Sequence, residues 1–277
     1  MSQAAICVVV PVYKAMATLD RCVESVLAQQ VEGGLTCILV DDGSPDESGA
    51  LCDVWATKDD RVTVIHQDDL GVSGARNSGL AAADSEFIVF LDSDDALRPG
   101  ALQAALTAQR AAPQDFVVWH YTTDEKDPAA VTADAEPRTQ AGLARLWLDC
   151  LLAMPWNKLY RADLAKQLQF DVQYTLGEDL QFVLDYIALL GQTVPEFGYR
   201  VMTSPLTFYD CSRGGTLSTR YHANYCDIWP KHFAKLNAAC HAAACPAEDM
   251  RPLHRAELQV FAEGVADIMR RDPSPTQ

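Results

Sequence analysis

The arrangement of apolar segments in the first 121 residues constrains the fold more than any other feature of the chain. Short apolar runs rich in Val, Ile and aromatic residues recur there, and polar, helix-forming segments separate them. Such runs predict strands buried on both faces, so the alternation predicts an α/β fold with a mostly parallel sheet and helices on both faces. We expect strands at 5–12, 36–41, 62–66, 87–91 and 116–121, helices at 19–30, from 44 onward and at 100–110, and a glycine-broken loop that enters a helix at 71–83.

The rest of the chain is less regular. A length of 277 residues suits one large domain with an appendage. We expect residues 1–121 and 122–222 to form two halves of one domain, and residues 223–277 to form a C-terminal helical extension. Within these limits the pattern predicts a polar connection or lid at 122–137, a helix at 138–154, an extended piece at 157–161, a helix at 179–190, a strand at 201–209 and Ala-rich helices from about 224.

Unusual polar residues follow three of the predicted strands. Pro11-Val12-Tyr13 follows the first strand, Asp41-Asp42-Gly43-Ser44 the second, and Asp92-Ser93-Asp94-Asp95 the fourth. Ligands of open α/β sheets bind beyond the carboxyl ends of the strands. The three segments are therefore expected to converge on one binding site.

The carboxylates of Asp92 and Asp94 are candidates for a metal site. Divalent cations such as Mg²⁺ take oxygen ligands and often share them with substrate phosphates. A solvated turn is the alternative interpretation of these two residues, but their position opposite Asp41 favours a site. Asp41 itself follows a buried strand, where a carboxylate needs a hydrogen-bond donor such as a base edge or a ribose hydroxyl. Asp42 is expected to hold the Gly43-Ser44 turn.

Two further segments carry groups that suit a site for an anionic ligand. Residues 71–79 contain three glycines and Arg76 at a helix start, which favours a phosphate but does not match a dinucleotide fingerprint. Glu178 and Asp179 stand at another predicted helix start, where the helix dipole stabilises negative charge. The same pair is a candidate for a catalytic base, which must be an ionised carboxylate within reach of a hydroxyl.

Charge and cysteine content narrow the class of protein. The chain has 22 basic and 38 acidic residues and a formal net charge of −16, which argues against nucleic-acid binding and against docking on an anionic membrane by charge alone. The nine cysteines are odd in number and widely spaced, which predicts free thiols in a reducing compartment. With no signal peptide and no apolar run of about 18 residues, we expect a cytoplasmic protein, soluble or peripheral at the inner face of the membrane.

Five of these segments, in this order along the chain, resemble the motif set of the family-two glycosyltransferases, which are inverting enzymes with the GT-A fold, a Rossmann-like architecture. The resemblance is close over roughly the first 100 residues and looser from Trp156 to Leu190. Five motifs in the right order are far more specific than any one of them. The segments are Val10–Tyr13, Val40–Ser44, Gly74–Gly79, Phe90–Asp95 and Gly177–Asp179.

The resemblance implies a role for each matching residue. Residues 1–121 would hold the nucleotide sugar, and residues 122–222 the acceptor and the catalytic base. Asp179 would be the general base, with Glu178 as its neighbour. Asp94 would bind Mn²⁺ or Mg²⁺ together with the donor diphosphate. The donor-binding residues would be Pro11, Val12, Tyr13, Asp41 (which would pair with the uracil edge), Arg76 (facing the base or diphosphate), Asp92, Ser93 and Arg213, and the acceptor-side residues would be Trp156, Asn157 and Lys158.

The function implied is metal-dependent transfer of a hexose or N-acetylhexosamine from a UDP-sugar to a hydroxyl of a glycan or lipid-linked acceptor, in surface polysaccharide synthesis. A nucleotidyltransferase and a non-catalytic nucleotide-sugar-binding protein are the alternatives. The former needs a Gly- and Lys-rich loop after the first strand, where the chain has Tyr13-Lys14-Ala15-Met16. Arginines near the C-terminus, at 251, 255, 270 and 271, suit peripheral membrane association, although core packing or homodimerisation is the preferred use of the last helices. His222 is left out of the metal site.

Overall fold

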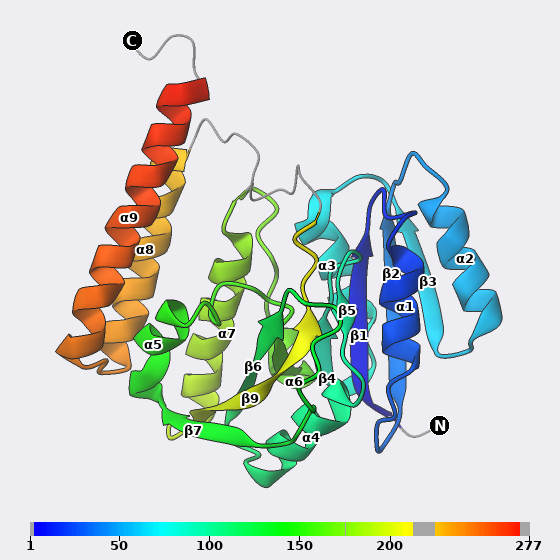
Figure 1. Cartoon of the computed structure of the whole chain (residues 1–277), viewed down its shortest axis with the longest axis horizontal. Helices are drawn as coiled ribbons and strands as arrows, with labels where there is room; N and C mark the ends of the chain where they lie inside the picture. The colour runs from blue at the N-terminus through cyan, green and yellow to red at the C-terminus, as the bar shows by residue number, and fades with distance from the viewer. Residues whose placement is uncertain (1–2, 175, 213–224, 272–277) are drawn as a thin grey trace.

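A computed structural model describes residues 3–174, 176–212 and 225–271 of the chain. The first part forms the expected parallel strands in the order β3-β2-β1-β4, with β1 central (Figure 1). The order brings the ends of β1 and β2 together, and Val12 pairs with Asp41 in register. The elements are β1 (Ala4–Val12), α1 (Leu19–Leu27), β2 (Leu35–Asp42), α2 (Ser48–Lys58), β3 (Val62–Gln67), α3 (Gly71–Ala82), β4 (Ser85–Phe90), β5 (Ala96–Leu97) and α4 (Ala101–Ala111).

The sheet becomes mixed beyond β4. The order continues β4-β8-β6-β9-β5, so the short strand β8 is antiparallel to both β4 and β6 and separates them. The predicted fifth strand, β6, therefore does not pair with β4. This second part contains β6 (Phe116–Thr122), β7 (Ala135–Thr139), a 3₁₀ turn η1 (Gln140–Gly142), α5 (Leu143–Leu148), β8 (Lys158–Arg161), α6 (Ala162–Ala165), α7 (Glu178–Thr193) and β9 (Gly198–Phe208).

Alternate residues of the central strands pack into two separate cores, one on each face of the sheet. In β1, Cys7 and Val9 belong to the core that includes side chains of α3, α5 and α7, whereas Ile6, Val8 and Val10 belong to the core that includes side chains of α1 and α4. Successive strand residues point to opposite faces, so a continuous apolar run buries both. The two-sided burial expected from the sequence is confirmed.

Two predicted segments differ from the structure. The segment from 138 to 154 is helical only at η1 and α5, and it begins in β7 (Ala135–Thr139), which pairs antiparallel with β9. The connection after β6 thus ends in a strand. Within the described part of the sheet, β7 pairs with β9 on one side and is an edge strand. An edge strand tolerates Pro, so Pro137 fits in β7. The helix expected from residue 44 begins at Ser48.

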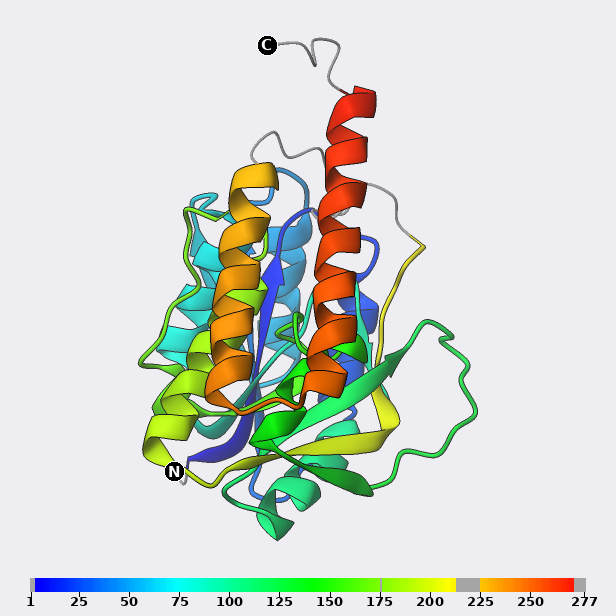
Figure 2. The ribbon, with the colours of Figure 1, turned by 90° about the vertical axis from the view of Figure 1, so that its left-hand side faces the viewer.

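The C-terminal part is a pair of antiparallel helices, α8 (Tyr225–Ala242) and α9 (Ala247–Arg271), which lie side by side in Figure 2. Figure 1 shows the pair beside α5 and α7 at one end of the molecule. Contacts of α8 with α7 and of α9 with α5 join the pair to the rest of the fold. None of the helices in the described part of the chain combines the length and apolar character needed to cross a membrane.

Candidate active site

The carboxyl end of β1 carries Pro11, Val12 and Tyr13, which the sequence assigned to the donor nucleoside. Pro11 and Val12 are buried, and the Val12 side chain belongs to the core on the α1 side of the sheet. Tyr13 is 43% exposed, and the Nζ atom of Lys14 lies 5.0 Å from the centre of its ring. Of the three side chains, only that of Tyr13 is presented to solvent at this edge.

Asp41 is held at the end of β2 by two donors. Its Oδ1 accepts a hydrogen bond from the Ser44 backbone N–H at 3.1 Å, and its Oδ2 lies 3.0 Å from Nδ1 of His66. Burial would raise the pKa of Asp41, but the hydrogen bonds from Ser44 and His66 outweigh it and lower the pKa. A side chain at position 49 would meet Oδ2, since a Cβ on Gly49 would lie 2.5 Å from it. Asp41 is thus an ionised acceptor of fixed orientation.

His66 was missed in the sequence interpretation. Its ring bridges two carboxylates, because Nε2 lies 3.0 Å from Oδ1 of Asp53 on α2 while Nδ1 contacts Asp41. Hydrogen bonds to Asp53 and then to Asp41 raise the pKa of His66. The signal that could have found it is positional, since His66 ends the apolar part of β3 and pairs with Asp41 in the parallel register.

Asp42 has the structural role that the sequence suggested, but its partners differ. Its Oδ1 accepts hydrogen bonds from Nε2 of Gln67 at 2.7 Å and from the Leu70 backbone N–H at 2.9 Å. It therefore ties β2 to the loop after β3, and the turn at Ser44 is held by Asp41 instead.

Arg76 joins two acidic segments of the candidate site. Its guanidinium is 3% exposed; Nη2 donates to Oδ1 of Asp92 at 2.8 Å and Nη1 donates to Oδ1 of Asp179 at 2.6 Å. Burial would lower the pKa of Arg76, but Asp179 and Asp92 raise it above its usual range. The guanidinium also lies over the Phe170 ring, 5.4 Å from its centre. Both terminal nitrogens of Arg76 therefore bind carboxylates, whereas the sequence interpretation had assigned Arg76 to the base or diphosphate.

The loop after β4 concentrates negative charge at this edge. Asp95 is fully buried, and its Oδ1 accepts the Asp210 backbone N–H at 3.0 Å, so it supports the loop. Burial, followed by the charge of Asp92, raises the pKa of Asp95 to about 9. Its Oδ2 has no hydrogen-bond partner within the described part of the protein. A buried carboxylate oxygen without a hydrogen-bond donor indicates that this loop has more anionic groups than donors to bind them.

Arg21 of α1 holds the backbone of this loop, and no sequence motif had indicated it. Its Nη2 donates to the Asp94 carbonyl at 2.5 Å and pairs with Oδ2 of Asp210 at 2.7 Å. A hydrogen bond from Ser212 and the pairing with Arg21 lower the pKa of Asp210 to about 2. The end of β9 is thereby fastened to the loop that carries the candidate metal ligand.

The donor set fits a hard divalent cation that shares its ligands with a substrate. Asp92 and Asp94 are partly exposed carboxylates beside the buried Asp95, so oxygen atoms predominate at this loop. Among the described residues, no group of three or more His, Cys, Asp or Glu side chains could hold a metal alone. Mg²⁺ and similar ions commonly need only one or two protein carboxylates when substrate phosphates complete the shell. Arg213 and His222 lie outside the described residues.

Asp179 and Glu178 begin α7, directly after Gly177. Glu178 is 9% exposed, and the Asp179 side chain is 29% exposed. Burial raises the pKa of Asp179 to about 7 even though Arg76 opposes it, and Glu178 and Asp92 add to the rise. A carboxylate with a pKa near neutrality, partly open to solvent, has the properties of a general base.

The assignment of Trp156, Asn157 and Lys158 to acceptor contact is corrected for the last two. Both are fully buried, and the Lys158 Nζ donates to the carbonyls of Leu151 and Met154 and to Oδ1 of Asn157, at 2.5–2.7 Å. Burial lowers the pKa of Lys158, and the three acceptors satisfy its amino group within the fold. Pairing of β8 with β4 and β6 forces this segment into the interior. Asn157 and Lys158 therefore shape the fold beneath the site.

Trp156 belongs to an aromatic cluster at the same edge. It stacks on Tyr209, with ring centres 5.3 Å apart and an angle of 16° between the planes, and it meets Tyr121 edge-on at 5.3 Å. Trp156 is 3% exposed, whereas Tyr121 and Tyr209 are half-buried. Burial and the nearby charge of Asp95 raise the pKa of Tyr209 to about 12. The two tyrosines border the acidic loop, and the sequence interpretation had not identified them.

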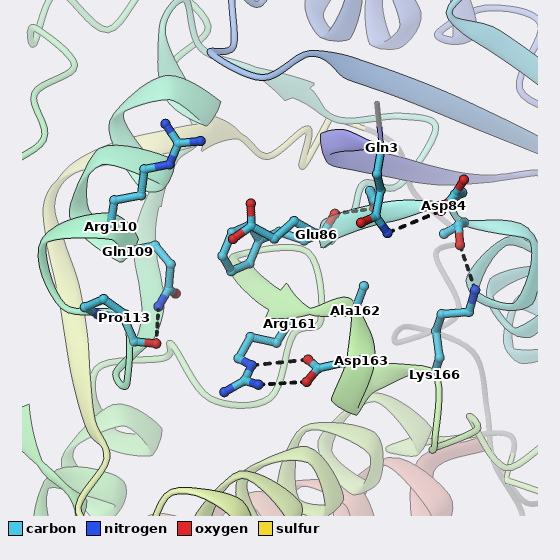
Figure 3. Close-up of a pocket in the computed structure, with 13 residues that line it drawn as sticks. Gln3, Asp84, Glu86, Gln109, Arg110, Pro113, Arg161, Ala162, Asp163 and Lys166 are labelled. Carbon is cyan, nitrogen blue, oxygen red and sulfur yellow. Dashed lines mark hydrogen bonds and ion pairs between the residues drawn. The ribbon is translucent and has the colours of Figure 1, made fainter. Parts of the chain in front are cut away.

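A separate cavity of about 630 Å³ lies at the opposite edge of the sheet (Figure 3). Its lining includes Gln3, which precedes β1, and Glu86, near the start of β4. Its lining carries both cationic and anionic side chains, and Arg161 pairs with Asp163 at 2.7 Å. The cavity therefore has no net charge selectivity and shares no residue with the acidic edge.

The sheet order, the helices on both faces and the acidic carboxyl edge define a GT-A fold. The chain belongs to glycosyl transferase family 2, whose family model matches residues 7–169, more than half of the chain. It is 38% identical over 124 residues to the glycosyltransferase GlyG of Streptococcus pneumoniae, covering 44% of this chain and 41% of GlyG. It is 32% identical over 211 residues to the succinoglycan biosynthesis protein ExoO of Rhizobium meliloti, covering 69% of this chain and 58% of ExoO.

Solved structures confirm the fold over nearly the whole chain. The S. aureus TarS fragment 1–349 in complex with UDP-GlcNAc superposes with a TM-score of 0.68 at 17% identity, covering 98% of this chain and 74% of that one. The mannosyltransferase PcManGT of Pyrobaculum calidifontis, in complex with GDP-Man and Mn²⁺, gives a TM-score of 0.59 at 17% identity, covering 99% of this chain and 77% of that one. The likeness extends beyond residue 169, where the family model ends.

Proposed function

We propose that the chain transfers a hexose or N-acetylhexosamine from a UDP-sugar to a hydroxyl of a glycan or lipid-linked acceptor, with inversion at the anomeric carbon. The observation that carries the proposal is the bridge made by Arg76. One buried guanidinium holds Asp92 of the acidic loop and Asp179 of α7, which are 87 positions apart in the sequence. A nucleotide-sugar-binding protein without catalysis has no need to join a candidate base to the donor loop.

The donor side of the proposal depends on Asp41 and Asp94. An ionised Asp41 of fixed orientation accepts a hydrogen bond from the imide N–H of uracil, which is a donor at that edge of the base. Asp94 would hold Mn²⁺ or Mg²⁺ with the diphosphate, and the cation would supply positive charge against the departing nucleoside diphosphate. The complexes of TarS with UDP-GlcNAc and of PcManGT with GDP-Man and Mn²⁺ support a nucleotide-sugar donor and a divalent cation for a protein of this fold.

The acceptor side depends on Asp179. Its carboxylate takes the proton of the acceptor hydroxyl while that oxygen attacks the anomeric carbon from the face opposite the diphosphate. One bond forms as the bond to the diphosphate breaks, so a single displacement inverts the configuration and no covalent enzyme intermediate forms. Tyr121 and Tyr209, which contact each other beside the acidic loop, would border the acceptor. ExoO, named for succinoglycan biosynthesis, supports a role in surface polysaccharide synthesis.

The division into residues 1–121 for the donor and 122–222 for the acceptor and base, with 223–277 as an extension, belongs to the same proposal. Cytoplasmic location, peripheral contact with the membrane and pairing of copies through α8 and α9 are further expectations for the whole protein.

The test compares Asp179→Asn with the unsubstituted chain, using a panel of UDP-sugars and an acceptor mixture in the presence of Mn²⁺. We expect transfer to fall by at least about a thousandfold, since the base is lost, while UDP binding with Mn²⁺ is retained. Gln192→Ala, a change at an exposed position near the far end of the same helix, serves as the matched control and should leave transfer unchanged. Full turnover by Asp179→Asn would remove the base assignment.

A further inference from the structure

The C-terminal helix α8 meets the start of α7 through one buried histidine. His232 is fully buried, and its Nε2–H donates to the Leu176 carbonyl at 2.9 Å. Its Nδ1 accepts a hydrogen bond from Nε2 of Gln181. Leu176 and Gln181 lie on either side of Glu178 and Asp179 in the sequence. The imidazole therefore spans the turn that presents the candidate base.

Gly177 is required for this approach. Its φ of +78° lies in the left-handed region, and a Cβ at this position would stand 2.3 Å from Nε2 of His232. Gly177 occupies the N-cap position of α7, where no side chain caps the helix. Because His232 holds the carbonyl just before the glycine, it determines the orientation of the peptide from which α7 starts.

A second contact from α8 supports the same turn. The Lys235 Nζ donates to the Gln181 carbonyl at 3.3 Å and pairs with Oδ1 of Asp185 at 2.8 Å. Burial lowers the pKa of His232, the Leu176 bond opposes this, and Lys235 and Lys231 add to the lowering. A neutral imidazole donates through Nε2 and accepts through Nδ1, which matches its two partners. The ring thus fixes geometry without adding a charge beside Asp179.

We infer that His232 is a positioning residue for Asp179, so that the C-terminal helices complete the catalytic unit. The inference rests on the proposed function, because it takes Asp179 to be the base. The chain of contacts runs from α8 through His232 to the first turn of α7, and from Asp179 through Arg76 to Asp92. Residue 232 lies outside the segment matched by the family model.

The experiment separates positioning from general stability by comparing two substitutions in the full-length chain. His232→Leu removes both hydrogen bonds but keeps an apolar side chain, whereas His232→Gln retains a donor long enough to reach the Leu176 carbonyl. We expect kcat to fall about 30-fold in His232→Leu, with the Kd for UDP and Mn²⁺ within about twofold of the original, because small misplacements of a reacting group cost this much. His232→Gln should recover kcat to within about threefold of the original.

His241→Leu is the matched control, since His241 is exposed on the same helix, and it should change neither quantity. A kcat within twofold of the original in His232→Leu would overturn the inference. Equal loss of kcat and of UDP affinity in both His232 variants would also overturn it, since that pattern indicates general structural damage. Asp179→Asn is measured alongside: if it remains active, the proposed function fails, whereas if it is inactive and His232→Leu is normal, only the positioning role fails.

Discussion

The donor edge and the base edge of the candidate site are positioned in different ways. Asp41 lies at the end of a strand, and the parallel pairing of β2 with β1 and β3 sets its place next to Val12 and His66. Asp179 starts a helix and is held by side chains from distant segments, Arg76 of α3 and, through the backbone, His232 of α8. Backbone ladders locate the first edge, and individual side chains locate the second. Single substitutions should therefore damage the base edge more than the donor edge.

The largest effect is expected where the two edges meet. Arg76→Met removes the only group that contacts both Asp92 and Asp179 in the described structure, so we expect transfer to fall by about a thousandfold. The free energy of unfolding should fall by about 2 kcal/mol, below the usual cost of breaking a buried pair because both carboxylates are partly exposed. Activity assays and urea unfolding measure the two effects. Arg76→Lys should also be defective in transfer, since the single ammonium of Lys cannot replace the two terminal nitrogens that bind Asp92 and Asp179.

Loss of the candidate metal ligand should affect the donor edge alone. We expect Asp94→Ala to weaken UDP binding in Mn²⁺ about 30-fold and to abolish the difference between Mn²⁺ and EDTA, because the shared ligand of cation and diphosphate is gone. Calorimetry with UDP measures the affinity. Asp124→Ala, an exposed change in the connection after β6, is the control. Equal affinity with and without Mn²⁺ in the original chain would contradict the metal site.

The pH dependence should report the base edge. Because the pKa of Asp179 is about 7 and the carboxylate form is the base, kcat/KM should rise with pH and level off above about 8. At pH 6 the value should be roughly tenfold below the plateau, since only about a tenth of Asp179 is ionised one unit below its pKa. Rates are measured with UDP affinity recorded at each pH, so that binding and chemistry are separated. A flat profile between pH 6 and 8 would count against Asp179.

The smallest effect is expected at the donor edge. The raised pKa of His66 means that its pairing with Asp53 and Asp41 stabilises the fold fully below pH 6.5 and that this contribution is lost as pH rises through the folded pKa. We expect a contribution of roughly 0.5 kcal/mol, because the His66 side chain is 48% exposed. In urea unfolding, the loss of stability between pH 6 and pH 9 should be larger by this amount in the original chain than in His66→Gln. His241→Gln should behave like the original chain.

Much of the donor edge could be predicted because its signals are local. Asp41, Asp92 and Asp94 each follow an apolar run, and topology places the ends of such strands at one edge. The prediction was wrong for Asn157 and Lys158, which the family resemblance had placed on the acceptor side. Insertion of β8 between β4 and β6 buried Asn157 and Lys158 instead. Strand order beyond β4 depends on pairing between distant segments, which no local pattern encodes.

The sequence by itself determined the family, the two-sided sheet and the residues that stand at the carboxyl ends of the strands. These features follow from periodicity and from motifs whose spacing is short. Only the tertiary structure decided that Arg76 joins Asp92 to Asp179, that His66 bridges Asp41 and Asp53, and that His232 holds the turn before Asp179. Each of these contacts forms between elements that the chain brings together only on folding, since its partners are 13 to 103 positions apart in the sequence.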